Sequence, residues 1–285
     1  MSGFLTDAID SLAVIITNNN PIEQSDYYGE DGLLRCGKCH TRKEGIYNFG
    51  EKLGEKKMPC LCKCKSEELD KQKEEERKWQ FKRKCERLRK DGIADPSYLA
   101  QTFSKDDGRN PKISKICWEY AEHWDEMKAD NIGILFYGSV GTGKSFQACC
   151  IAHALIDKGV SVCVTNFPRI LNKLQGFGED KQSFLDRLNG YDLLVIDDLG
   201  VERDTSYSVE QIFNVIDVRS RSGKPLIVTT NLSLSDLKNP SSLGYSRIYD
   251  RILEMCPIKL KITGESRRTI NTAEKCERAK RILGL

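Results

Sequence analysis

The chain has 285 residues, a length that suits one well-sized core and one small additional unit. Its 45 Lys and Arg residues nearly balance 42 Asp and Glu residues, and the formal net charge of +3 does not by itself indicate a nucleic-acid-binding protein. No apolar run approaches the roughly 18 residues of a membrane-spanning helix, which argues against a membrane protein.

The first 20 residues are expected to form a short amphipathic helix and a polar loop. Their apolar stretch, Leu12–Ile16, follows Asp7 and Asp10 without a basic segment, a poor match to a secretory signal peptide. Half of the twelve cysteines are scattered through the second part of the chain rather than arranged as a disulfide framework. Free thiols indicate a reducing compartment, so a cytoplasmic protein is expected.

Cysteines cluster in residues 33–64 and predict a structural zinc site. The sequence CGKC at 36–39 is followed by CLCKC at 60–64, and paired thiols at such spacing are typical of structural zinc. This polar segment has little apolar area to bury, so a metal would supply its folding free energy. Unligated thiols and an iron–sulfur cluster are the alternatives. The predicted zinc ligands are Cys36, Cys39, Cys60 and Cys62, with Cys64 as the first substitute and His40 as an outside candidate.

Residues 65–92 are dense in charges of both signs, with pairs such as Glu74 and Lys78 at helical spacing. They predict a solvated helix that joins two units. Because four thiolates leave no open coordination position, the zinc module is expected to bind a partner rather than to catalyse. The predicted domains are 1–64, an N-terminal helix and zinc-binding module; 65–92, a charged helical linker; and 93–285, a larger domain.

From about residue 95 onward, apolar strands alternate with helices. The strand centres are uniformly apolar, which predicts an α/β fold of three layers, a five-stranded parallel sheet covered by helices on both faces. The predicted strands are 134–137, 160–165, 193–196, 226–229 and 258–262. The predicted helices are about 144–158, 168–175, 182–189, 206–222 and 243–254.

The sequence GSVGTGKS at 138–145 fits the phosphate-binding pattern GxxxxGK[ST] without a mismatch, between an apolar strand and a helix. Its glycines allow backbone N–H groups to wrap a phosphate, and the start of the helix adds to the attraction. We therefore predict binding of ATP with Mg²⁺. Lys144 is expected to reach the β- and γ-phosphates, and Ser145 to bind Mg²⁺. The predicted nucleotide-binding residues are Gly138, Ser139, Val140, Gly141, Thr142, Gly143, Lys144, Ser145, Phe146 and Asp197.

Two carboxylates end the apolar run LLVIDD at 193–198. A phosphate-loop enzyme needs an acid here to hold Mg²⁺ through its water shell, which fits Asp197, while Asp198 is placed to orient or deprotonate the attacking water. The later strand LIVTTN ends in Asn231, whose amide is expected near the γ-phosphate. A further strand between the loop strand and the acidic strand would put Asn231 between Lys144 and Asp197.

Two pairs of arginines follow. Arg247 and Arg251 lie four residues apart and share one face of the helix before the last strand, where a cation could reach the γ-phosphate of a neighbouring subunit. A solvated basic face is the alternative. Arg267 and Arg268 follow the last strand, and one of them is expected to contact the γ-phosphate within the same chain. Further basic residues are dispersed through this domain, where simple solvation is the alternative to contact with nucleic acid: Arg203, Arg219, Arg221, Lys224, Lys238, Lys275, Arg278, Lys280 and Arg281.

The order of these motifs resembles the AAA+ ATPases of the bacterial replicative-helicase loaders (DnaC/DnaI type), of which the transposase helper ATPase IstB is a close relative. The resemblance covers about residues 90–280 and rests on GSVGTGKS, LLVIDDLG, FNVIDVRSRSGKP, LIVTTN, SRIYDRI and GESRR. It implies these roles: Asp197 and Asp198 as the Walker B pair, Asn231 as sensor 1, Arg251 as an arginine finger acting in trans, and Arg268 as sensor 2, with Arg247 and Arg267 as neighbouring alternatives. The implied catalytic residues are thus Lys144, Asp198, Asn231, Arg251 and Arg268.

The resemblance also implies an AAA+ domain without a C-terminal lid, since seventeen residues follow Arg268. The aromatic segment from Tyr98 to Phe103, or a neighbouring subunit, would then cover the nucleotide.

The implied function is an ATP-dependent loader that places a DnaB-type replicative helicase on single-stranded DNA during replication initiation. It would assemble as a homo-oligomer on ATP and bind the helicase through its N-terminal module. An IstB-like helper that remodels target DNA for a transposase is the first alternative. A stand-alone metabolic kinase is the second, and the acidic strand followed by TTN and an arginine-bearing helix fits it less well. Single-stranded DNA binding rests on the resemblance, since the sequence shows no aromatic and basic module of its own.

Overall fold

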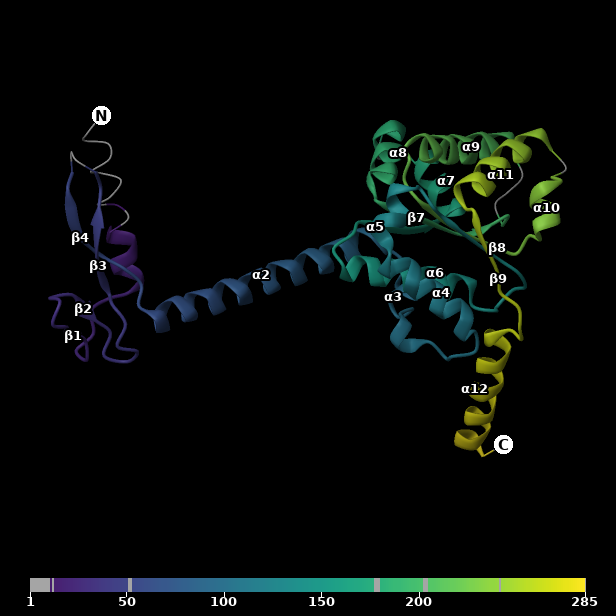
Figure 1. Ribbon diagram of the computed structural model, residues 1–285. Coiled ribbons are helices and arrows are strands. Elements are labelled where there is room, and N and C mark those ends of the chain that lie inside the picture. Colours follow the sequence, from purple (N-terminus) through teal and green to yellow (C-terminus); the bar gives the residue numbers. More distant parts are fainter. Residues whose placement is uncertain are drawn as a thin grey trace. The chain divides into compact units, whose positions relative to one another are not determined.

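A computed structural model of the chain describes residues 11, 13–50, 53–176, 180–201, 205–240 and 242–284. The chain separates into two compact units, residues 1–81 and 82–285. The division falls inside α2 (Lys63–Gly92) (Figure 1). The bounds of α2 confirm the helix predicted over 65–92. Only Cys85 and Gly92 are buried on α2, as expected for a charged, solvated helix.

Two short antiparallel ladders build the smaller unit. β1 (Tyr27–Tyr28) pairs with β2 (Leu34–Arg35), and β3 (Glu44–Asn48) pairs with β4 (Glu55–Pro59) as a hairpin. Residues 13–19 form a helix before them, while residues 1–10 of the predicted N-terminal helix lie outside the described part of the chain.

A buried ion pair lies inside this smaller unit. Lys43 Nζ is 2.5 Å from Asp26 Oδ2, and both side chains are almost fully buried. Burial opposes ionisation of Asp26, but hydrogen bonds from Lys43 and from the backbone N–H groups of Glu23 and Gly37 hold its pKa below the ordinary value. Polar contacts therefore carry much of the organisation of this unit.

The larger unit contains a five-stranded parallel sheet with the strand order β6-β7-β8-β5-β9. All five predicted strands are confirmed: β5 has the predicted bounds, and the ends of the other four shift by at most three residues. The largest shift is at β7, which continues to Leu199 past an irregularity in its pairing with β8. The strands are β5 (Ile134–Tyr137), β6 (Val162–Asn166), β7 (Leu193–Leu199), β8 (Leu226–Thr230) and β9 (Ile258–Lys261).

Helices cover both faces of this sheet. The five predicted helices are confirmed as α6 (Lys144–Asp157), α7 (Phe167–Gln175), α8 (Lys181–Gly190), α9 (Ser206–Arg221) and α11 (Leu243–Met255). The structure adds α3 (Pro96–Leu99), a 3-10 turn at Phe103–Lys105, α4 (Pro111–Glu122), α5 (Trp124–Ala129), α10 (Leu234–Lys238) and α12 (Arg267–Leu283).

The alternation of side chains along β5 explains the three layers. Ile134 and Phe136 join the apolar cluster under α4 and α6, whereas Leu135 joins the cluster under α7, α9 and α11. In Figure 1, α4 and α6 accordingly lie on one side of the sheet and α8, α9 and α11 on the other. The predicted three-layer α/β fold is confirmed.

The end of α2 is anchored to the edge strand β6. Ile93 forms a parallel bridge with Val164, and the Tyr191 hydroxyl donates to the Asp91 carbonyl at 3.2 Å. A Cβ on Gly92 would lie 1.8 Å from the Val162 carbonyl oxygen, so only glycine allows this approach.

Two of the dispersed basic residues named in the sequence have structural roles within the larger unit. Arg219 is fully buried, and its guanidinium donates to the carbonyls of Tyr191, Asp192 and Pro225 at 2.6–2.9 Å. Burial lowers its pKa to about 10. Lys224 donates to two carbonyls at the end of α8. Arg203 lies outside the described residues.

Candidate functional site

The phosphate loop lies between β5 and α6, at the carboxyl end of the sheet where ligands bind in open α/β folds. Gly138, Gly141 and Gly143 all have positive φ, which opens the loop around its own N–H groups. At Gly143 a Cβ would lie 2.8 Å from the Arg267 guanidinium, so the glycine also admits this arginine. The loop has the backbone that phosphate binding requires.

Lys144 lies buried at the start of α6 and is already oriented toward the loop. Its Nζ donates to the carbonyls of Gly138 at 3.0 Å and Ser139 at 2.7 Å, and to Asn231 Oδ1 at 2.8 Å. Burial lowers the pKa of Lys144, and the charges of Asp198 and Asp197 oppose that shift. The contact to Asn231 confirms that the amide lies beside Lys144, since β8 separates β5 from β7.

The two acidic residues differ in their surroundings. Asp197 is buried, and its oxygens accept from Thr229 Oγ1 at 2.6 Å and from the Tyr98 hydroxyl at 2.8 Å. Asp198 has a φ of 54° at the irregularity of β7, and its N–H donates to the same Thr229 hydroxyl at 3.0 Å. Asp198 is half-buried, and burial followed by the charge of Asp197 raises its pKa.

A cleft of about 450 Å³ gathers the predicted site residues at this edge of the sheet. Asp197 lies behind the cleft rather than in its lining, while Asp198 faces it. The lining residues are Gln101, Val140, Gly141, Gly143, Lys144, Ser145, Phe146, Asp198, Val201, Asn231, Arg267 and Arg268. Ten of these twelve residues carry roles predicted from the sequence, counting Arg267 as the alternative to Arg268; the other two are Gln101 and Val201.

Arg267 and Arg268 both reach this cleft, but their surroundings differ. Arg267 lies 3.0 Å from Asp107 and its guanidinium lies 5.4 Å from the centre of the Phe146 ring. Arg268 lines the cleft without such a contact in the part of the chain that the structure describes, and its charge lowers the pKa of both Asp198 and Lys144. Arg267 is therefore held by contacts within the protein, while both arginines line the space for a ligand.

The other pair of arginines lies on α11, away from this cleft. Arg251 is 2.5 Å from Asp217 and 4.6 Å from the centre of the Phe213 ring, both on α9. Arg247 is exposed and lines a groove of about 460 Å³ between α9 and α11. Neither of these two described side chains lines the nucleotide cleft of its own chain.

The segment from Tyr98 to Phe103, expected to cover the nucleotide unless a neighbouring subunit does so, reaches the cleft, but not through its two aromatic side chains. Tyr98 is buried and bonded to Asp197, and Phe103 packs edge-on against Trp118 beside the core. Burial raises the pKa of the Tyr98 hydroxyl, so it remains a proton donor. Within this segment, Gln101 lines the cleft. Sequence reasoning missed the hydrogen bonds that Tyr98 and Thr229 donate to Asp197. Tyr98 lies in the aromatic segment and Thr229 in the strand LIVTTN, so both lie in segments that the sequence analysis considered.

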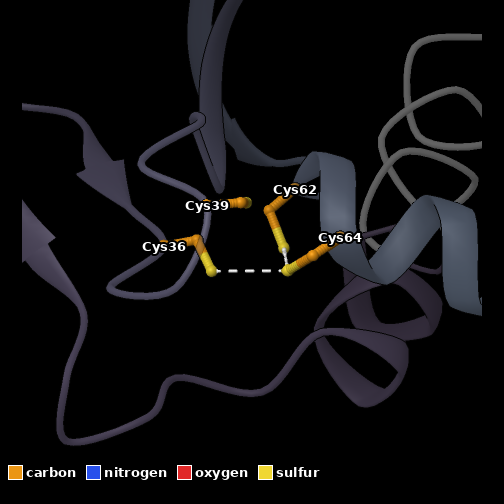
Figure 2. Close-up of side chains that lie close together, drawn as sticks. All are labelled: Cys36, Cys39, Cys62 and Cys64. Carbon is orange, nitrogen blue, oxygen red and sulfur yellow. Dashed lines mark hydrogen bonds between the residues drawn. The ribbon is translucent and has the colours of Figure 1, made fainter.

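Four thiols gather in the smaller unit: Cys36, Cys39, Cys62 and Cys64 (Figure 2). Their sulfurs all lie within 4.8 Å of one another, and Cys64 Sγ is 3.6 Å from Cys36 Sγ and 3.5 Å from Cys62 Sγ. A tetrahedron with Zn–S bonds of about 2.3 Å has sulfurs about 3.8 Å apart, so this cluster fits zinc.

Cys64 takes the place that the sequence analysis assigned to Cys60. Cys60 follows β4, and its sulfur faces the Arg42 carbonyl at 3.6 Å. Cys62 and Cys64 lie where α2 begins, and this first turn brings both sulfurs toward the CGKC loop at 36–39. The spacing of the cysteines alone could not show that Cys60, at the end of β4, would lie outside the cluster of four thiols.

Together, the parallel sheet, the phosphate loop and the acidic strand define a P-loop nucleotide-binding protein of the AAA+ type. Residues 110–275 match the family of IstB-like ATP-binding proteins, and the chain belongs to that family. Within the described part of the chain, every helix is too short or too polar to cross a membrane.

Three similar proteins show how far the likeness extends. The replicative helicase loader DnaC of Escherichia coli (strain K12) is 30% identical over 138 residues, 47% of this chain and 54% of that protein. A Mycobacterium tuberculosis (strain ATCC 25618 / H37Rv) protein described as an ATP-binding protein in an insertion sequence is 31% identical over 34% of this chain and 40% of its own length. A crystal structure of the DnaC helicase loader is 26% identical with a TM-score of 0.50, covering 59% of this chain and 100% of that one. The alignment thus spans about half the length of the curated DnaC relative.

Proposed function

We propose that the larger unit binds ATP with Mg²⁺ and hydrolyses it. The observation that carries this proposal is the convergence of Lys144, Asp198, Asn231 and Arg268 on one cleft beside the phosphate loop. Lys144 supplies positive charge to the β- and γ-phosphates, and Arg268 to the γ-phosphate. Asn231 holds Lys144 at 2.8 Å and presents its amide to the same space.

Ser145 and Asp197 are the residues that would hold Mg²⁺. When bound, the ion neutralises phosphate charge as bond cleavage proceeds. Asp197 fits this role because each of its oxygens accepts one hydrogen bond from the protein and keeps a further lone pair for a metal-bound water. Asp198, once ionised, accepts a proton from the attacking water.

We assign the arginine finger to Arg251, with Arg247 as the alternative, acting on the nucleotide of a neighbouring subunit. Both lie on α11, outside the cleft of their own chain, and Arg251 is held in place by Asp217 and Phe213. A guanidinium that is fixed outside the cleft of its own chain is suited to contact the γ-phosphate bound by a neighbouring subunit.

Mixing two inactive variants tests this assignment. Lys144→Ala removes the phosphate contact of one subunit, and Arg251→Ala removes the arginine supplied to the next. Each alone is expected to lose most ATP hydrolysis, while a mixture regains part of it because some interfaces pair an intact site with an intact arginine. A mixture as inactive as its components would contradict action in trans.

For the whole protein, we propose a cytoplasmic, ATP-dependent loader of a DnaB-type replicative helicase onto single-stranded DNA. The likeness to DnaC supports the activity, and a structural zinc held by Cys36, Cys39, Cys62 and Cys64 supports a separate docking module for the helicase. In this proposal the predicted domain 1–64 docks the helicase, 65–92 is the helical linker and 93–285 binds and hydrolyses ATP.

The test measures helicase retained on circular single-stranded DNA with ATP. The full chain is expected to increase retention, whereas Lys144→Ala and the Cys36→Ser/Cys39→Ser double variant are not. The double variant should keep ATP binding, since its substitutions lie in the other unit. Equal retention with and without the protein would overturn the loader proposal.

An IstB-like helper of a transposase is the second candidate, favoured by the likeness to the insertion-sequence protein. It would bind DNA in an ATP-dependent manner but leave helicase retention unchanged. Stimulation of strand transfer by a transposase in the absence of helicase would favour this second function.

A further inference from the structure

A chain of polar contacts runs from Asp197 to the end of α2, and none of its members lines the nucleotide cleft. It begins at Tyr98, whose hydroxyl donates to Asp197 Oδ2 at 2.8 Å although the two residues are 99 positions apart in sequence. Tyr98 is the buried residue of α3, a helix of only four residues. Such a short helix cannot fix the position of its own side chains, so neighbouring contacts must do so.

His153 on α6 provides the next contact. Its Nε2 donates to the Tyr98 carbonyl at 3.0 Å, and its Nδ1 accepts from Arg89 Nε at 3.3 Å. Burial lowers the pKa of His153, which favours the neutral ring with one N–H and one lone pair that these two contacts require. The Arg89 guanidinium also pairs with Asp157 at the end of α6.

We propose that Tyr98 is a positioning residue for Asp197 and that the last turn of α2 sets its position through Arg89 and His153. This inference rests on the proposed ATPase function. It identifies α2 as a regulatory element of the magnesium-binding carboxylate. A partner that bends or pulls α2 would move Arg89, loosen the Tyr98 carbonyl and release one of the two hydrogen bonds that orient Asp197.

The geometry makes this coupling sensitive to small movements. A hydrogen bond of 2.8 Å weakens steeply once its atoms separate by more than about 0.5 Å. Thr229 would then hold Asp197 from one side only, and the carboxylate would rotate. Close to Arg89, Gly92 and Ile93 tie the same helix end to β6, so a force on α2 acts on a turn that is packed against the larger unit.

Tyr98→Phe tests the first step, because it removes only the hydroxyl and keeps the buried ring. ATP hydrolysis with single-stranded DNA present is expected to fall about tenfold, and the Mg²⁺ concentration for half-maximal rate to rise severalfold, as for other residues that orient a metal ligand. Nucleotide affinity measured without Mg²⁺ should stay unchanged.

Tyr120→Phe is the matched control. Tyr120 is equally buried in the same apolar cluster, and its hydroxyl donates to the Ile132 carbonyl at 2.7 Å, away from Asp197. Both variants should lose comparable thermal stability, but only Tyr98→Phe should change the Mg²⁺ dependence. The same Mg²⁺ dependence in both variants would overturn the positioning role.

Arg89→Ala tests the link to α2, with Lys90→Ala, an exposed neighbour on the same turn, as its control. Arg89→Ala is expected to raise the half-maximal Mg²⁺ concentration about threefold and to add nothing further in the presence of Tyr98→Phe, since both act through one contact. Additive effects, or an Arg89→Ala variant that behaves like Lys90→Ala, would overturn control by α2.

Asp197→Asn separates this inference from the function on which it rests. If Asp197→Asn hydrolyses ATP at the rate of the unaltered protein, the proposed ATPase mechanism fails. If Asp197→Asn is inactive while Tyr98→Phe is unaffected, the mechanism stands and only the positioning role is overturned.

Discussion

Thr229 holds the two acidic residues in their relative orientation. Its hydroxyl accepts from the Asp198 N–H at 3.0 Å and donates to Asp197 Oδ1 at 2.6 Å. This contact accompanies the positive φ of Asp198, a conformation that costs free energy in a non-glycine residue and that its surroundings must hold. One hydroxyl therefore contacts both the proposed metal-binding acid and the proposed base.

Thr229→Val keeps the shape of the side chain but leaves a buried N–H and a carboxylate oxygen without this partner. We expect the free energy of unfolding to fall by about 1–3 kcal/mol, measured by denaturant titration, together with a lower rate of ATP hydrolysis. Thr229→Ser retains the hydroxyl and should recover most of the rate. A valine variant with full activity would show that the hydroxyl does not position the acids.

The raised pKa of Asp198 predicts a pH dependence. Burial raises this pKa first and the charge of Asp197 second, while Lys144 and Arg268 oppose the shift. Between the ordinary aspartate pKa and the raised one, the folded protein binds more protons than the unfolded chain, so this residue lowers stability as pH rises through that window. Hydrolysis needs the ionised form, so the rate should rise through the same window.

Arg268→Gln removes one opposing charge and should move the acid limb of the kcat profile to higher pH. Asn231→Ala keeps that charge and serves as the control that lowers the rate without moving the limb. An unshifted limb in Arg268→Gln would mean that Asp198 is not the titrating base.

At the scale of elements, the sequence predicted what depends on local pattern. Five apolar runs became five parallel strands, and the longer periodic segments became helices. It did not predict α3, α5 or α10, because four to six residues give too little periodicity to detect, and it also missed the longer helices α4 and α12. It also missed contacts between distant segments, such as Tyr98 with Asp197 and the carbonyls around Arg219, because no local pattern records which distant groups a fold brings together.

The junction of α2 with β6 gives a prediction for one element. Gly92→Ala would place a Cβ 1.8 Å from the Val162 carbonyl oxygen, so the helix end or the strand must move. We expect a loss of about 2–4 kcal/mol in the free energy of unfolding of the larger unit. Gly190→Ala, at the end of α8, is the control because its Cβ would meet nothing within 4 Å. Equal stability of the two variants would contradict the close approach at Gly92.

At the scale of the whole molecule, the two units have different sources of stability. Both apolar clusters of the larger unit lie within residues 85–262. In the described part of the smaller unit, the buried apolar residues are Leu33, Leu34, Cys36 and Cys62, and two of these belong to the thiol cluster. A unit with so little apolar interior is expected to depend on a metal held by the four-thiol cluster to fold.

Removal of zinc by a strong chelator should therefore unfold the smaller unit and leave the melting temperature and nucleotide binding of the larger unit unchanged. Cys64→Ser and Cys60→Ser form the decisive pair, because only Cys64 belongs to the four-thiol cluster. Metal analysis of the purified full chain should find one zinc per chain in Cys60→Ser and a markedly lower content in Cys64→Ser. The reverse result would return Cys60 to the ligand set, and zinc-free protein with an intact smaller unit would show that hydrogen bonds such as Lys43 to Asp26 suffice to hold it.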